Sequence, residues 1–101
     1  MFELNGLYKS KQFTLKIDDR KFSLFNPMKK EVCCGFITYI SSYIKDNKKT
    51  KLAITNRQLI CSNTNLNIGL IESMYYHNNT IIIAYLDKAN NIKTNTLEKE
   101  H

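Results

Sequence analysis

Lysine, arginine and asparagine side chains in two short segments are the residues of this chain best suited to bind another molecule. These residues form the candidate site: Lys48, Lys49, Lys51, Arg57, Lys88, Asn90, Asn91 and Lys93. Lysine and arginine neutralise phosphate groups, and asparagine forms two hydrogen bonds with the edge of adenine. We therefore predict that the first segment holds the phosphates of double-stranded DNA and that the second segment reads its bases.

The charge of the chain favours such a polyanionic partner. The 101 residues have a formal net charge of +6. Residues 45–57 carry five Lys or Arg and one Asp, a net of +4, whereas residues 72–101 carry three Lys and four Asp or Glu, a net of −1. The positive field therefore centres on residues 45–57. A charge run is also typical of a solvated loop, and Asn90-Asn91 is also typical of a hairpin turn.

Other chemistry has little support in the sequence. His77 and His101 are the only histidines, and no second ligand follows either at a metal-binding spacing, so no metal is expected. Asp18-Asp19 is followed by Arg20-Lys21, which is typical of an exposed turn rather than of a catalytic carboxylate pair. The chain has no glycine-rich phosphate loop. We predict a protein that is not an enzyme and has no cofactor.

The cysteines predict a reducing compartment. Cys33, Cys34 and Cys61 are odd in number and two are adjacent, so they form neither a disulfide framework nor a CxxC motif. The start of the chain lacks the basic and apolar regions of a signal peptide. The longest apolar run, residues 81–86, is far shorter than the roughly 20 residues that span a bilayer. We therefore expect a soluble cytoplasmic protein.

Two β-hairpins are predicted at the ends of the chain. Apolar and polar residues alternate before and after residues 18–21, so residues 13–25 fit a first hairpin. Residues 80–86 and 92–97 fit a second hairpin, with its turn at residues 87–91.

Helices are predicted between the hairpins. Asn26-Pro27 is a typical helix start, and residues 28–46 carry apolar side chains at spacings of three and four. Thr55–Gln58 fits a capping box at the start of a short helix. Residues 62–65 supply a turn, and residues 66–77 form the next helix. The apolar positions of these two longer helices are Val32, Cys33, Phe36, Ile37, Ile40, Tyr43 and Ile44, then Leu66, Leu70, Ile71, Met74 and Tyr75.

This order of elements resembles the winged helix-turn-helix family over residues 13–97, an α+β fold with an N-terminal β-hairpin and a C-terminal β-wing. Residues 1–12 are then a flexible arm and residues 98–101 a tail. Size, basic charge and a composition rich in Asn, Ile and Lys, as in proteins of AT-rich genomes, also resemble the small winged-helix relaxosome accessory proteins of clostridial conjugative plasmids. That resemblance implies binding to repeats at a plasmid origin of transfer during conjugation, together with a relaxase or other relaxosome proteins.

In one respect the chain departs from the family, and this shifts the predicted base contacts away from the recognition helix. Residues 65–77, which stand where the recognition helix would be, contain no Lys or Arg and include Glu72. We therefore assign base reading to the β-wing. We predict that Met74, Tyr75 and Tyr76 of this helix form the contact of a homodimer. Specific binding to repeated DNA sites favours a dimer.

An all-β fold is the alternative. Residues 52–54, 59–61 and 68–71 are short apolar runs that periodicity cannot assign to helix or strand. Read as strands, they predict a small barrel of the pleckstrin-homology type. The corresponding function is a protein-interaction adaptor without DNA specificity.

Overall fold

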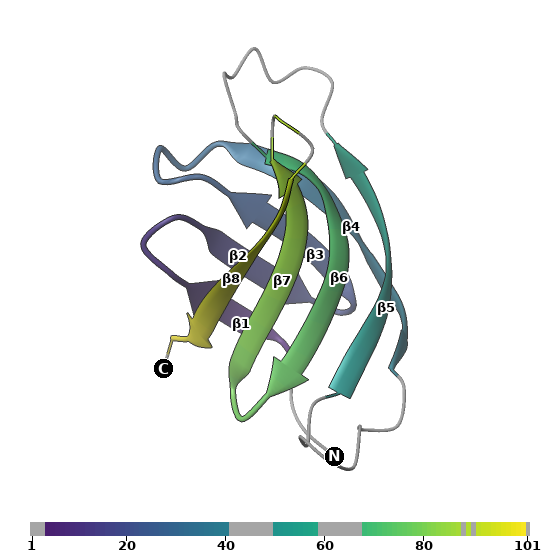
Figure 1. Ribbon diagram of the computed structural model, residues 1–101. Helices are drawn as coiled ribbons and strands as arrows, with labels where there is room; N and C mark the ends of the chain where they lie inside the picture. The colour runs from purple at the N-terminus through teal and green to yellow at the C-terminus, as the bar shows by residue number, and fades with distance from the viewer. Residues whose placement is uncertain (1–3, 41–49, 59–67, 88, 90, 101) are drawn as a thin grey trace.

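Antiparallel strands, each paired with the next in the sequence, close into a barrel (Figure 1). The computed structural model describes residues 4–40, 50–58, 68–87, 89 and 91–100. Within these residues the strands are β1 (Gly6–Lys9), β2 (Thr14–Asp18), β3 (Lys21–Phe25), β4 (Glu31–Ile40), β5 (Thr50–Gln58), β6 (Ile68–His77), β7 (Thr80–Asp87) and β8 (Ile92–Lys99). The first and last strands pair through Tyr8 with Lys99 and Lys9 with Glu98, which closes the barrel.

Side-chain alternation explains why these segments are strands. In β2 and β3 every second side chain is buried, and the same holds along most of β7. An eight-stranded barrel is just wide enough for such side chains to fill it. The largest fully buried side chains are Tyr8, Leu15, Ile17, Phe22, Leu24, Ile37, Leu52, Ile71, Met74, Ile81, Ile83 and Leu97. The barrel interior is therefore the hydrophobic core.

Asparagine and aspartate make the turns of this barrel. Asn78 and Asn79, between β6 and β7, have φ of 48° and 60°, a left-handed conformation that asparagine tolerates. Asn26, between β3 and β4, is buried, and its Oδ1 accepts hydrogen bonds from the backbone N–H groups of Met28 at 2.9 Å and Lys30 at 3.0 Å. The amide predicted to cap a helix therefore caps a turn between two strands.

The predicted α+β winged helix is wrong, because the described residues contain strands and no helix. The two hairpins are present, as β2–β3 and β7–β8, but both belong to the barrel. Residues 6–9, assigned to a flexible arm, form β1, and β8 extends to Lys99 in the assigned tail. The all-β alternative is the correct fold class: residues 52–54 and 68–71 lie in β5 and β6, and residues 59–61 lie outside the described part.

Irregular register in β4 explains the false prediction of helix 28–46. Between Glu31 and Cys33 the pairing with β3 shifts by one residue, so that Val32 and Cys33 are both buried. A second shift lies between Ile37 and Tyr39 in the pairing with β5. Each extra residue interrupts strict alternation, as β-bulges do. The first shift makes Val32 and Cys33 adjacent buried residues, and Ile37 follows Cys33 on the same face of the strand four residues later. Spacings of one and four also match a helical stripe.

The same effect explains the false helix 66–77. The pairing of β6 with β7 shifts on both sides of Ile71, and buried Ile71 and Met74 are consequently three residues apart. The capping-box residues Thr55–Gln58 lie inside β5, where Thr55 stands opposite Phe36 of β4. A capping box depends on four residue types only, so it recurs by chance in strands.

Strands β5 and β6 are neighbours in the barrel and pair beside the β6–β7 turn. Their pairs are Thr50 with Tyr76, Lys51 with Tyr75 and Leu52 with Met74. On its other side, β5 pairs with β4 as far as Gln58.

Candidate functional site

The outer face of β2, β3 and β4 carries a row of small side chains at its centre. Lys16 stands opposite Ser23, and Ser23 stands opposite Cys34. Side chains directly opposite one another in antiparallel strands project from the same face of the sheet. Arg57 occupies the next position of this row on β5, opposite Cys34. The centre of the row therefore has only a hydroxyl and a thiol above the sheet.

Longer side chains occupy the neighbouring row. Lys21 of β3 stands opposite Phe36 of β4, which in turn stands opposite Thr55 of β5. Phe36 is 52% exposed although it lies in the middle of a strand. Because Ser23 and Cys34 are short, a groove of about 510 Å³ lies beside this phenylalanine.

Both charged and apolar groups line this groove. Its contributing side chains are Lys21, Ser23, Glu31, Cys34, Phe36 and Thr55. An ammonium group and a carboxylate are thus present near an exposed aromatic ring. An aromatic centre with a polar rim is the usual composition of a protein-binding surface. We call these six residues the β3–β5 groove.

The four large hydrophobic side chains exposed in the described chain are Leu7, Met28, Phe36 and Ile92. Met28 lies in the β3–β4 turn, and Ile92 begins β8. Of these four, Phe36 is the one that lines the groove. Single exposed apolar residues need no functional explanation, but an exposed aromatic beside a concave surface is a better candidate for a contact.

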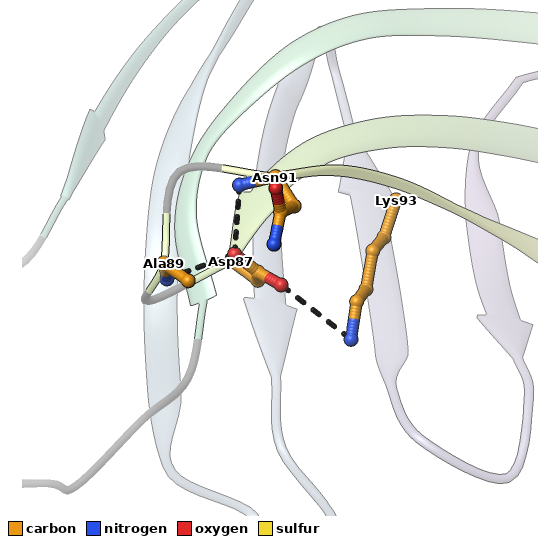
Figure 2. Close-up of polar contacts among 4 residues, drawn as sticks. All are labelled: Asp87, Ala89, Asn91 and Lys93. Atoms are coloured by element: carbon orange, nitrogen blue, oxygen red, sulfur yellow. Dashed lines mark hydrogen bonds and ion pairs between the residues drawn. The ribbon is translucent and has the colours of Figure 1, made fainter.

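The β7–β8 hairpin, predicted to read bases, is organised by a carboxylate (Figure 2). Asp87 Oδ1 accepts hydrogen bonds from the N–H groups of Ala89 at 2.9 Å and Asn91 at 2.8 Å. Its Oδ2 lies 3.5 Å from Nζ of Lys93. The hydrogen bond from Asn91, supported by those from Ala89 and Lys93, lowers the pKa of Asp87 against the opposing effect of desolvation. Lys93 and the backbone of Asn91 therefore stabilise the turn.

The structure places four of the predicted site residues on two separate parts of the barrel. Lys51 is exposed on β5, and Arg57 lies near the end of the same strand. Asn91 and Lys93 are exposed at the β7–β8 hairpin. Strands β6 and β7 separate β5 from β8 in the barrel order. The remaining four residues, Lys48, Lys49, Lys88 and Asn90, lie outside the described part of the chain.

The residues predicted to form a dimer contact lie on opposite sides of β6. Tyr76 is buried at 8% exposure, and its hydroxyl donates a hydrogen bond to Oδ1 of Asn79 at 2.9 Å. Met74 is fully buried, whereas Tyr75 between them is half-buried. Met74 and Tyr76 thus belong to the barrel core, and dimerisation itself stays a prediction.

The groove does not follow from the sequence as long as Phe36 and Cys33 are assigned to one helical stripe. Adjacent residues of a strand face opposite sides, so the pair Cys33-Cys34 carried a usable signal. Cys33 is fully buried and Cys34 is partly exposed. Had residues 31–40 been interpreted as a strand, Cys34 and Phe36 would have been placed together on one face.

Metal and membrane chemistry find no candidates in the part of the chain that the structure describes. It contains no group of three or more His, Cys, Asp or Glu side chains placed to hold a metal ion. It also contains no helix of the length and apolar character needed to cross a membrane.

No family model matches this chain, and comparison with curated proteins and with solved structures found no match either. The relaxosome resemblance depended on a helix-turn-helix, and the described strands leave no place for one. Conjugation and a plasmid origin therefore have no support beyond that resemblance. The class that the fold defines is a small antiparallel β-barrel with a groove on its outer face.

Proposed function

We propose that this protein is a non-catalytic interaction module, a small β-barrel adaptor that binds a partner protein at the β3–β5 groove. The observation that carries the proposal is Phe36, which is 52% exposed beside a groove of about 510 Å³. An exposed aromatic ring beside a concave surface suits a contact with a partner. We place the protein in the cytoplasm, because three cysteines, two of them adjacent, do not form a disulfide framework and suit a reducing compartment.

The energetics agree with a contact centred on Phe36. Complete burial of a phenylalanine side chain contributes about 1.5–3 kcal/mol. Because about half of the ring is already covered, binding would gain roughly 1–1.5 kcal/mol from this ring alone. Lys21 and Glu31, at the same groove, would give orientation through hydrogen bonds to polar groups of the partner.

The test is a selection of peptides from a random display library on the folded protein, followed by titration of the synthesised peptides. Phe36→Ala should weaken their binding about tenfold. Met28→Ala is the matched control, because Met28 is 75% exposed but lies outside the groove. NMR shifts on binding should map to residues 21–23, 34–36 and 55. If no selected peptide depends on Phe36, the groove is not the binding site.

Duplex DNA is a second candidate partner, favoured by the net charge of +6. Fluorescence anisotropy with random duplex DNA at increasing salt separates the two functions. An adaptor should show weak binding that disappears near physiological salt. Tight binding to one DNA sequence that persists at that salt would favour a DNA-binding protein instead.

A further inference from the structure

The β3–β5 groove has opposite charges at its two ends. Lys21 begins β3, and Glu31 begins β4, where it stands opposite Phe25, the last residue of β3. Because Phe25 lies four residues after Lys21 and a strand rises about 3.3 Å per residue, the two charged positions are roughly 13 Å apart along the strands. Ser23 and Cys34, which stand opposite each other, form the floor of the groove between them.

Both charges are available to a partner. Among the residues that the structure describes, the ion pairs lie elsewhere, at the contact of β1 with residue 100 and at the β7–β8 hairpin. Asp18 stands opposite Lys21 on β2, but these two side chains do not form an ion pair within the described structure. A partner can therefore meet Lys21 and Glu31 without breaking an ion pair.

Hydrogen-bonded turns hold these charges in place. In the turn before β3, the carbonyl of Arg20 accepts a hydrogen bond from the N–H of Ile37 at 2.7 Å, which fixes this turn against β4. In the turn before β4, the N–H of Asn26 donates to the carbonyl of Lys30 at 2.9 Å. A site whose backbone is already ordered loses less entropy when it binds a partner.

We infer that the partner presents an extended segment with an acidic and a basic residue four positions apart and an apolar residue midway between them. This inference rests on the proposed function and specifies what the groove recognises. Alternate side chains of an extended chain point to the same side, so the first, third and fifth residues span about 13 Å on one face. The acidic residue would meet Lys21 and the basic residue Glu31, while the apolar residue would lie over the floor beside Phe36.

The shape of the groove favours such a segment over a second copy of this chain. A symmetric dimer centred on the groove would bring the same surface of each copy together. The short side chains Ser23 and Cys34 of one copy would then face those of the other and leave a void. Stable interfaces pack as densely as protein interiors, so a protruding apolar side chain is the better occupant of this depression.

The test uses three capped, fluorescein-labelled peptides titrated against the full chain by fluorescence anisotropy at physiological salt. The mixed peptide is Ser-Glu-Thr-Leu-Thr-Lys-Ser, the acidic peptide has Glu at both charged positions, and the basic peptide has Lys at both. The mixed peptide should bind about fivefold more tightly than either of the others, because each mismatch replaces an attraction by a repulsion. Moving its lysine by one position should lose a similar factor, because that side chain then points away from the groove.

Charge reversal at the groove should change which peptide binds best. Lys21→Glu should transfer the preference to the basic peptide, and Glu31→Lys should transfer it to the acidic peptide. Lys11→Glu and Glu72→Lys are the matched controls, because they make the same changes of net charge at exposed positions outside the groove. These two variants should keep the preference for the mixed peptide. Circular dichroism establishes that all four variants remain folded.

The outcomes separate this inference from the proposed function. Failure of the three peptides to bind, equal binding of all three, or a change of preference in the control variants overturns the inference. In each case the groove still stands if library peptides depend on Phe36. A change of preference in the groove variants together with binding unchanged by Phe36→Ala keeps the inference and overturns the contact with Phe36. Self-association of the chain that Lys21→Glu abolishes would instead favour a second copy and overturn the segment.

Discussion

Cys33 and Cys34 are adjacent in the sequence, and the barrel predicts that their thiols react at very different rates. Cys33 is 0% exposed inside the barrel, and Cys34 is partly exposed at the groove. Iodoacetamide can reach Cys34 in the folded protein. It can reach Cys33 only after the sheet opens around β4.

The size of the difference follows from the free energy of that opening. Core strands open with free energies close to that of global unfolding, which is at least about 5 kcal/mol for an ordinary domain. Since 1.4 kcal/mol corresponds to a factor of ten, Cys33 should react at least about a thousandfold more slowly than Cys34.

The assay compares Cys33→Ser and Cys34→Ser variants, each in a Cys61→Ser background, by mass spectrometry over time. In denaturant the two remaining thiols should react at similar rates, which controls for intrinsic reactivity. A peptide that occupies the groove should also slow labelling of Cys34. Folded-state rates within a factor of about ten of each other would refute the orientation of β4, since one opening event would then expose both thiols equally.

Three further predictions concern stability. Asn26→Ala should lower the free energy of unfolding by about 2 kcal/mol, since it removes the acceptor of two backbone hydrogen bonds; urea denaturation measures this, and Asn26→Asp should retain most of the stability. Ile83→Ala should lower the free energy of unfolding by about 3 kcal/mol because it leaves a cavity in the core. Thr94→Ala, at an exposed position of β8, should change it by less than about 0.5 kcal/mol in the same assay. The pKa of Asp87 is lowered from 3.8, so its stabilisation of the β7–β8 hairpin is fully present above pH 3.8 and is lost as the pH falls through the lower folded value. The NMR signal of the Asn91 amide should report this loss. An unchanged signal down to acid unfolding would contradict it.

The sequence predicted the strands that alternate regularly and failed on those that do not. Both β2–β3 and β7–β8 have clear period-two patterns and short polar turns, and both hairpins are in the structure. β4 and β6 each contain register shifts that break this alternation, so that buried residues are adjacent in β4 and three residues apart in β6. Such a shift depends on the partner strand, so no local pattern reveals it.

The candidate groove could not be predicted from local sequence patterns either. Ser23 and Cys34 are brought side by side by the pairing of β3 with β4, and Phe36 with Thr55 by the pairing of β4 with β5. Sequence spacing gives no indication of these partners until the register is known. The predicted basic and amide residues were identified by type alone, and the barrel separates those on β5 from those at the β7–β8 hairpin.

The contacts between β1 and β8 have a consequence for synthesis of the chain. Every other strand pair joins neighbours in the sequence, so hairpins such as β2–β3 can form as soon as they leave the ribosome. Closure instead requires Tyr8 to meet Lys99, whose Nζ lies 5.9 Å from the centre of the tyrosine ring, and Glu100 N–H to reach the carbonyl of Leu7. The sheet therefore stays open beside Tyr8 until residues 98–100 have emerged from the ribosome. During that interval the nascent chain exposes two unpaired strand edges to chaperones and to other nascent chains.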